Sequence, residues 1–157
     1  MTAFLDTSVL VAAFYGDHEH HGPSLALLAE QSRSTGSTAA HCLAEVYSVL
    51  TGMPGKDRVS PHEALLFLGD VRERLVTIIL EETEYFAVLE RAASTGVTGG
   101  SAYDAIIAHC ALKSAAQTLY TWNVRHFRRL GEHISARVRE PEDSRSSTVQ
   151  EGQPDST

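Results

Sequence analysis

Short apolar runs alternate with longer stretches of mixed polarity along most of the chain, which predicts strands alternating with helices. Residues 2–5 (TAFL) predict a short buried strand. The run LVTIIL at residues 75–80 is β-branched and apolar, as expected of a central strand covered on both faces. Two more strands are expected at residues 36–40 and 118–122, and a last edge strand at residues 134–138.

Helices are expected between these strands, and two have clear end signals. Ser60, Pro61 and Glu63 combine a capping serine, a proline at the first helical position and an acid in the first turn. A helix over residues 83–95 should end at Gly96. Other helices are expected at residues 9–13, 24–34, 41–53 and 102–115. Strands that alternate with helices imply an α/β fold with a mostly parallel sheet covered on both faces.

Length and composition fit one globular domain followed by a polar tail. The chain has 157 residues, of which 43% are apolar and 21% are charged. We expect the domain to span residues 1–140 and the rest, 141–157, to be disordered because it has almost no apolar residues. The net charge is −7, and residues 142–157 account for −3 of it. An acidic domain argues against a nucleic-acid partner unless carboxylates are gathered there to bind cations.

The sequence predicts a soluble, cytoplasmic protein. Cys42 and Cys110 each lie in an apolar helical run without a CxxC pair, so buried free thiols in a reducing compartment are expected. The apolar N-terminus has no preceding basic residue and is interrupted by Asp6, which distinguishes it from a secretion signal. No stretch approaches the roughly 18 apolar residues that a membrane span needs.

Three carboxylates stand at positions from which a strand-end site draws its ligands. In parallel α/β sheets, ligands bind at the carboxyl ends of the strands. Asp6 directly follows the first strand, and Glu45 lies one turn into the helix after a short strand. Asp104 opens a helix that is almost wholly apolar, where a carboxylate is costly unless it is paired or bound to metal.

Each carboxylate also has a plainer explanation. Asp6 can cap the helix that follows it, although Thr7 and Ser8 are themselves suitable N-cap residues. Asp104 has capping-box spacing from the serine three residues before it, and Glu45 can simply face solvent. Asn123 follows the strand at residues 118–122 and is a fourth candidate, with a helix-cap or turn role as its alternative.

Four segments in order resemble the motifs of PIN-domain proteins, and among them most closely the VapC-type toxins of bacterial toxin–antitoxin pairs. These segments are FLDTSVLVAAF, LAEVYSVL, YDAIIAHCAL and TWNVRHFRRL, and the resemblance covers residues 1–140. It implies a three-layer α/β/α domain and an endoribonuclease site built on Asp6, Glu45 and Asp104. Many relatives carry an aspartate where this chain has Asn123, which leaves open whether one or two metal ions bind.

The resemblance implies hydrolysis of RNA by metal-activated water. Oxygen ligands suit Mg²⁺ or Mn²⁺. Asp6 and Asp104 are expected to ligate the principal ion, and Glu45 to ligate it or orient the attacking water. Asn123 and either Thr7 or Ser8 would position waters and the scissile phosphate. Attack by water should leave a 5′-phosphate and a 3′-hydroxyl.

Two polar clusters and two aromatic side chains leave alternatives open. Arg125, His126, Arg128 and Arg129 could hold RNA phosphates or form a solvated helix face. The histidines of residues 18–21 (HEHH) lack the spacing of a recognised zinc site and favour a polar loop. Core packing explains Trp122 and Tyr103 at least as well as base stacking does.

Two other functions are compatible with parts of the sequence, and two kinds of partner are expected. A phosphatase with an aspartate nucleophile would place a second acid two residues later, where Ser8 stands. A catalytically weak PIN-fold protein acting mainly as a binding partner is the non-enzymatic alternative. The resemblance also implies a cognate antitoxin covering the acidic groove and a homodimer formed through helices. Residues 24–31 and 60–71 offer apolar helical faces for these contacts.

Overall fold

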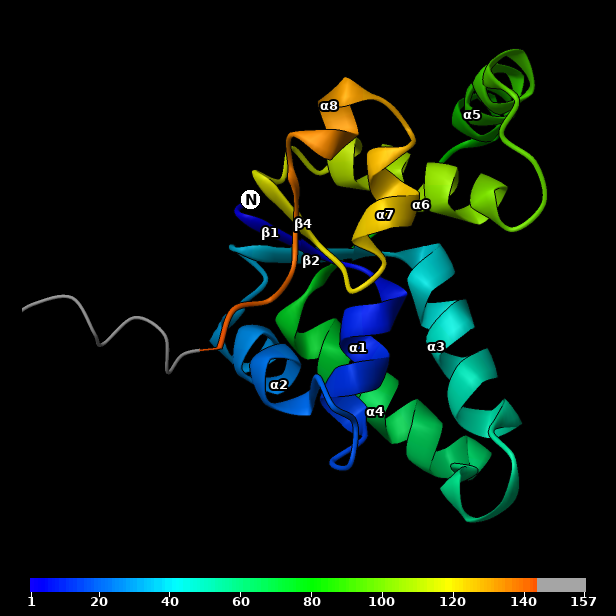
Figure 1. Ribbon diagram of the computed structural model, residues 1–157. Helices are drawn as coiled ribbons and strands as arrows, with labels where there is room; N and C mark the ends of the chain where they lie inside the picture. Colours follow the sequence, from blue (N-terminus) through cyan, green and yellow to red (C-terminus); the bar gives the residue numbers. More distant parts are fainter. Residues whose placement is uncertain (144–157) are drawn as a thin grey trace, which may run out of the picture.

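A five-stranded parallel sheet forms the centre of the protein in a computed structural model, which describes residues 1–143 (Figure 1). The strands lie in the order β3-β2-β1-β4-β5, and every neighbouring pair is parallel. They are β1 (Ala3–Leu5), β2 (Gly36–Ala39), β3 (Val76–Ile78), β4 (Thr118–Tyr120) and β5 (Val138–Arg139). The chain builds outward from β1 to β2 and β3, then returns to place β4 on the other side of β1. This reversal of strand order is where ligands bind in open α/β sheets.

Helices cover both faces of the sheet, which confirms the predicted α/β/α layers (Figure 1). One face carries α1 (Thr7–Phe14), α2 (His21–Glu30), α3 (Ala40–Gly52) and α4 (Pro61–Arg74). The other carries α6 (Ser101–Lys113), α7 (Val124–Arg128) and α8 (Glu132–Ser135), with α5 (Glu82–Thr95) packed outside α6. A short 3-10 turn, Gly55–Asp57, joins α3 to α4. None of the helices within residues 1–143 is long and apolar enough to cross a bilayer.

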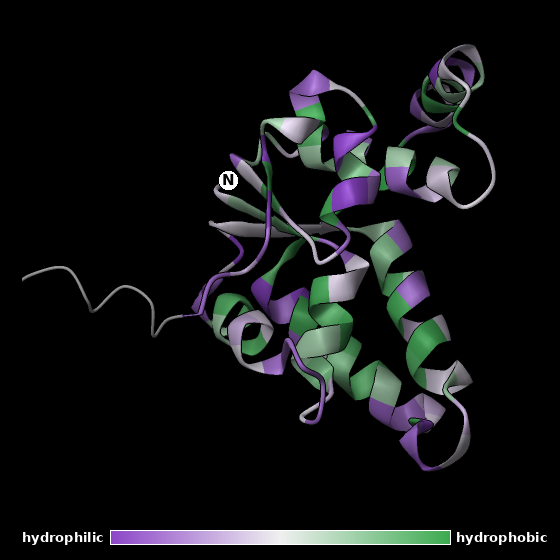
Figure 2. Ribbon diagram, in the orientation of Figure 1, coloured by the Kyte–Doolittle hydropathy of each residue, from purple (hydrophilic) through white to green (hydrophobic). Residues whose placement is uncertain are grey.

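The core lies between these layers and is richest around β1 and α1. Phe4, Leu5, Val9 and Leu10 are fully buried, and Figure 2 shows α1 as a largely apolar helix. The two cysteines are buried and free, as the sequence predicts.

Several local signals act as expected. Ser60 and Glu63 form a complete capping box at the start of α4, in which each side chain binds the other's backbone N–H. Gly96 ends α5 in the left-handed conformation (φ 75°) that glycine adopts without strain.

Two strand predictions were wrong. The apolar run at residues 75–80 forms an edge strand and not a central one, because only Val76–Ile78 pair with β2, and they are half-buried. Leu75 and Leu80 at its ends are buried, whereas Ile79 is 67% exposed. The apolar run therefore has two origins: Leu75 is the buried end of α4, and Val76–Ile78 form an edge strand.

The last edge strand was placed too early. Ile134 belongs to α8 and is buried, and β5 begins at Val138. The predicted disorder of residues 141–157 lies outside the described residues from 144 onward, and residues 141–143 have no regular structure.

We predict that Gly36→Ala destabilises the fold by about 1–3 kcal/mol. A Cβ at Gly36 would lie 2.5 Å from Leu75 Cδ2 and 2.8 Å from Gln31 Cβ, so the junction between β2 and α4 would have to move. Gly69→Ala in α4 is the matched control, because its Cβ would meet no atom within 4 Å, and it should stabilise the helix by roughly 0.5–1 kcal/mol. Urea unfolding of both variants measures the difference. Equal stability of Gly36→Ala and wild type would contradict the tight packing.

Candidate active site

Asp6 is a buried carboxylate held at the end of β1. It is 2% exposed and acts as the N-cap of α1, since its Oδ1 accepts the N–H groups of Ser8 (2.9 Å) and Val9 (3.3 Å). The Ser8 hydroxyl donates to the same oxygen (2.6 Å), and the buried Thr121 hydroxyl donates to Oδ2 (2.7 Å). Of the caps that the sequence left open, the structure thus shows Asp6, and Thr7 and Ser8 are the first two residues of α1.

The same hydrogen bonds join the ends of two neighbouring strands. Ser8 Oγ accepts the N–H of Trp122 (2.9 Å), and Thr121 Oγ1 accepts the N–H of Asn123 (2.9 Å). These residues lie directly after β4, which pairs with β1 on the side where the strand order reverses. The backbone around Asn123 is thus fixed relative to Asp6 at the topological switch point.

Burial raises the pKa of Asp6 to about 6 in spite of the four hydrogen bonds that favour its charged form. A carboxylate kept at this position is costly for the fold. It resembles an active-site group more than a simple cap, because an exposed cap would keep its ordinary pKa.

Glu45 and Asp104 form the second part of the site. Burial also raises the pKa of both carboxyls, and the charge of Asp104 raises that of Glu45 further. Two histidines oppose this effect: His41 Nε2 lies 3.0 Å from Glu45 Oε1, and His126 Nδ1 lies 3.8 Å from Asp104 Oδ2. The two carboxyls stand on α3 and α6, which contact each other.

The helix-cap alternative for Asp104 does not hold. Helix α6 begins at Ser101 and its N-cap is Gly100, so no side chain caps it. The solvent alternative for Glu45 stays open in part, because its side chain is 37% exposed while its Oε1 atom is buried.

Three buried polar atoms at this site lack a hydrogen bond to any described residue: Thr7 Oγ1, His41 Nε2 and Glu45 Oε1. The 3.0 Å contact between His41 and Glu45 does not have hydrogen-bond geometry. Buried polar atoms normally find partners, so their gathering here indicates a place for a ligand or its water shell. Thr7 directly follows Asp6 in the first part of the site, whereas His41 and Glu45 belong to the second part, so both parts contain such atoms.

A hollow of about 490 Å³ opens beside these groups. Its lining includes Thr7, Ser8 and Glu45 on one side and Trp122 and Asn123 on the other. The loop between α1 and α2 completes it with His18, Glu19 and His20. The structure thus brings predicted residues from three distant motifs to one hollow, with Asp6 buried beneath.

The polar loop and the aromatic side chains have clear positions. His20 stacks on Trp122 (ring centroids 3.7 Å apart), and Trp122 Nε1 donates to the buried Ser24 hydroxyl (2.8 Å). Trp122 is thus a packed, half-buried residue. Tyr103 is 54% exposed and stacks on His41, so the core-packing explanation was wrong for Tyr103.

The three carboxylates are not assembled as a ready ligand set. Within residues 1–143, no three His, Cys, Asp or Glu side chains lie close enough together to hold one metal ion. The expected ligation by Asp6, Glu45 and Asp104 therefore stays a prediction, and any ion would need waters or movement to complete its shell.

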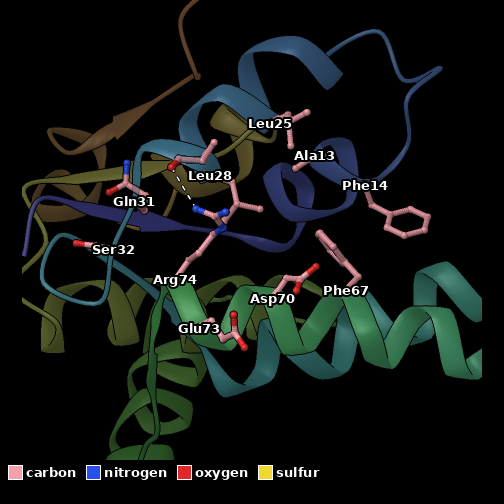
Figure 3. A pocket seen from close by; sticks show the side chains of 11 residues that line it. Ala13, Phe14, Leu25, Leu28, Gln31, Ser32, Phe67, Asp70, Glu73 and Arg74 are labelled. Atoms are coloured by element: carbon pink, nitrogen blue, oxygen red, sulfur yellow. Dashed lines mark hydrogen bonds between the residues drawn. The ribbon is translucent and has the colours of Figure 1, made fainter.

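A separate hollow of about 630 Å³ lies between α1, α2 and α4 (Figure 3). Phe14, Phe67 and Leu25 form its apolar side, and Arg74 donates to the Ala29 carbonyl across it (3.2 Å). It also contains Asp70 and Glu73. None of the predicted catalytic residues lines it.

Comparisons with known proteins agree with this architecture. The sequence model of the PIN domain family matches residues 3–132. The chain belongs to the PIN domain family. It is 35% identical over 120 residues to Ribonuclease VapC40 of Mycobacterium tuberculosis, an overlap of 76% of this chain and 85% of the relative.

Two solved structures show the same fold as this PIN domain. One is VapC20 of Mycobacterium tuberculosis, described as a sarcin-ricin loop cleaving toxin, with a TM-score of 0.63 at 19% identity over 80% of this chain and 92% of the other. The second is VapBC2 from Rickettsia felis bound to a promoter DNA fragment, with a TM-score of 0.62 at 22% identity over 89% and 98%.

Sequence reasoning missed two residues of this PIN domain's site. Thr121 holds Asp6 from the end of β4, and its only sequence signal is a hydroxyl directly after an apolar strand. His41 stands four residues before Glu45, a spacing that places both on one helix face.

We predict that Asp6→Asn stabilises the metal-free PIN domain at pH 7.5. The folded-state pKa of Asp6, about 6, exceeds the ordinary value of 3.8. Between these values the folded protein binds more protons than the unfolded chain, so stability falls as pH rises from about 4 to 6. Above that window the buried charge costs roughly 1–3 kcal/mol, which a neutral amide removes.

Urea unfolding in EDTA at pH 4.5 and 7.5 measures this effect. The gain of Asp6→Asn over wild type should be present at pH 7.5 and much smaller at pH 4.5. Asp70→Asn, at an exposed carboxylate on α4, should show no such pH-dependent gain. A variant less stable than wild type at pH 7.5 would mean that hydrogen bonds to the charged form outweigh its desolvation.

Proposed function

We propose that this PIN-domain protein is a divalent-metal-dependent endoribonuclease and the toxin of a toxin–antitoxin pair. The observation that carries this proposal is the gathering near the buried Asp6 of buried polar atoms from Thr7, His41 and Glu45 that have no hydrogen bond to a described residue, although His41 Nε2 and Glu45 Oε1 lie 3.0 Å apart. A site with this much desolvated acid needs a cation to compensate it. The similarity to Ribonuclease VapC40 supports RNA as the substrate.

The donor chemistry of the site fits Mg²⁺ or Mn²⁺. Its candidate ligands are carboxylate oxygens from Asp6 and Asp104, supplemented by Glu45, and hard oxygen donors suit these ions. Mg²⁺ usually keeps several waters and takes one or two carboxylates, which agrees with a site where three carboxylates are not already in contact. When bound, such an ion acidifies water and neutralises charge on the phosphate.

Side chains of the protein would orient the attacking water, accept its proton and contact the scissile phosphate. Glu45, whose pKa is raised by burial, is placed to orient a water and accept its proton. The Thr7 hydroxyl lies near Glu45, whose pKa it lowers, and forms no short hydrogen bond, so it can donate to the scissile phosphate. The Ser8 hydroxyl is instead engaged with Asp6 and Trp122. We therefore favour Thr7 over Ser8 as a direct substrate contact.

Asn123 and Arg125 complete the proposed substrate site. Asn123 is exposed at the rim of the hollow, where an amide can position a water or a phosphate oxygen but provides no charge. Together with the missing fourth carboxylate, this favours one firmly held ion and a second, weaker one. Arg125 lies on α7 directly after it, with its side chain exposed.

We predict that Asp104→Asn lowers RNA cleavage in Mg²⁺ by at least roughly 100-fold, because one ligand charge is lost where phosphate charge develops. Asp70→Asn should cleave like wild type, since Asp70 lines the separate hollow on α4. End-mapped sequencing of RNA after controlled expression of each protein identifies the cuts.

The products distinguish the mechanism. Cleavage by water should leave 5′-phosphate and 3′-hydroxyl ends and should stop on addition of EDTA. Ends with a 2′,3′-cyclic phosphate, or cleavage that survives Asp104→Asn, would contradict the proposal. A protein that folds and never cuts RNA would support the binding-partner alternative.

The proposed antitoxin would cover the hollow that contains Glu19 and Glu45, which we call the acidic hollow. A homodimer would form through helices. Both segments that the sequence indicated carry exposed leucines: Leu25 in α2 is 44% exposed, and Leu65 and Leu66 in α4 are 64% and 59% exposed. Adjacent exposed leucines on one helix are typical of a contact surface.

We predict that the double variant Leu65→Lys and Leu66→Lys is a folded monomer where the wild type is a dimer, because charge would have to be desolvated in the contact. Static light scattering across protein concentrations gives the mass, and circular dichroism checks folding. Glu90→Lys in α5, at an exposed charged position, is the control and should remain dimeric. An unchanged dimer in the leucine variant would exclude α4 from the interface.

A further inference from the structure

Only some of the basic side chains of this acidic protein form hydrogen bonds or ion pairs within the described residues. Of the 13 Lys and Arg residues of the chain, all but Arg145 lie within residues 1–143. Half of those 12 donate side-chain hydrogen bonds: Arg33, Arg58, Arg74, Lys113, Arg137 and Arg139. The others have no hydrogen bond or ion pair with a described residue: Lys56, Arg72, Arg91, Arg125, Arg128 and Arg129. Four of these unused cations, Arg91 and the three arginines of residues 125–129, line two hollows beside α7.

The first hollow adjoins the candidate active site. It has a volume of about 700 Å³, and its polar lining consists of Asn123, Arg125, His126, Arg128, Arg129 and one acidic side chain, Glu140. Asn123 also lines the acidic hollow, so the two are continuous at this residue.

The second hollow lies between α5, α6 and the segment around α8. It has a volume of about 360 Å³, and its basic side chains are Arg91, His109, Arg129 and His133. Apolar side chains form the rest of its walls, including Val88, Ala92, Ala105, Leu112 and Ile134. No acidic side chain among the described residues lines it.

Arg129 lines both hollows, so they adjoin at this residue, and arginine side chains are present from Arg125 on α7 to Arg91 on α5. We call the surface formed by Arg125, Arg128, Arg129 and Arg91 the α7 arginine surface. Figure 1 shows α7 beside α6 on the outer side of the sheet, and Figure 2 shows α7 as strongly hydrophilic. Unpaired arginines concentrated on an otherwise acidic protein indicate a polyanionic partner.

We propose that the RNA strand cut at the active site continues over the α7 arginine surface and ends in the hollow between α5, α6 and α8. This inference rests on the proposed nuclease function and specifies its substrate class as RNA with a single-stranded extension on one side of the cut. Arg125, Arg129 and Arg91 bind successive backbone phosphates. The apolar walls of the far hollow accept a nucleobase while its basic rim binds the phosphate.

Continuity with the active site favours RNA over an acidic peptide as the occupant. A strand whose scissile phosphate lies beside Asn123 must leave the site on some side, and this is a route lined by unpaired cations. Arg125 and Arg129 are one helical turn apart, about 6 Å along the axis, so both can contact one strand.

The test compares RNA binding in EDTA, where no cleavage occurs, for a 4-nucleotide and a 16-nucleotide oligouridylate. Wild type should bind the longer RNA more tightly. The double variant Arg91→Gln and Arg129→Gln should lose most of this length advantage. Its plot of log affinity against log salt concentration for the 16-mer should be shallower by about 1.4, because each phosphate that an arginine no longer neutralises lowers the slope by about 0.7.

The matched control is the double variant Lys56→Gln and Arg72→Gln, which removes two exposed, unpaired cations away from α7. It should keep the wild-type salt slope and length dependence. Thermal unfolding checks that each variant is folded. Oligomers extended by ten nucleotides on only the 5′ or only the 3′ side of the cut then show which end of the RNA lies on the α7 arginine surface.

Two results would overturn the inference. One is an unchanged salt slope in Arg91→Gln and Arg129→Gln. The other is a variant that binds RNA normally but loses the cognate antitoxin, which would assign this surface to an acidic protein segment. Failure of the nuclease proposal looks different, because wild type in Mg²⁺ would then cut no RNA, whatever the arginines bind.

Discussion

The burial of the Asp6 carboxylate between the ends of β1 and β4 is the constraint on which the site depends. Ser8 and Thr121 hydroxyls bind its two oxygens, and the same hydroxyls accept the N–H groups of Trp122 and Asn123. One buried acid thus fixes the start of α1 and the start of the segment leading to α7. Because these strands flank the reversal of strand order, the groups they carry must meet there.

This arrangement trades stability for a binding site. A charge at Asp6 is desolvated, and the buried atoms of Thr7, His41 and Glu45 lack hydrogen-bond partners among the described residues. In a core built only for stability, each would be costly. They are concentrated at one place, while α4 and α5 have complete caps, so the cost is local to the candidate site.

The sequence predicted the layers and most helices because their signals are local: the capping box at Ser60, the glycine at 96 and the alternation of apolar runs. It failed where a local pattern has two causes. The apolar run at residues 75–80 does not reveal that Leu75 ends a helix at the sheet edge. Asp6 and Asp104 could be predicted from their places at the starts of helices, and Glu45 from motif order. The i, i+4 spacing of His41 and Glu45 was a local signal that was not used, whereas no spacing between distant segments reveals the contact of Thr121 with Asp6.

Helix α7 reconciles an acidic protein with a nucleic-acid substrate. His126 of this helix lies 3.8 Å from Asp104, and the arginines of residues 125–129 line two neighbouring hollows. The net negative charge of the protein would by itself repel phosphates. This repulsion is screened beyond about 10 Å at moderate salt, so only charges close to the bound strand matter. Within that distance the local arrangement of charges decides, and arginines without ion pairs line a hollow that shares Asn123 with the hollow containing Glu45. A net charge of −7 therefore does not argue against RNA here.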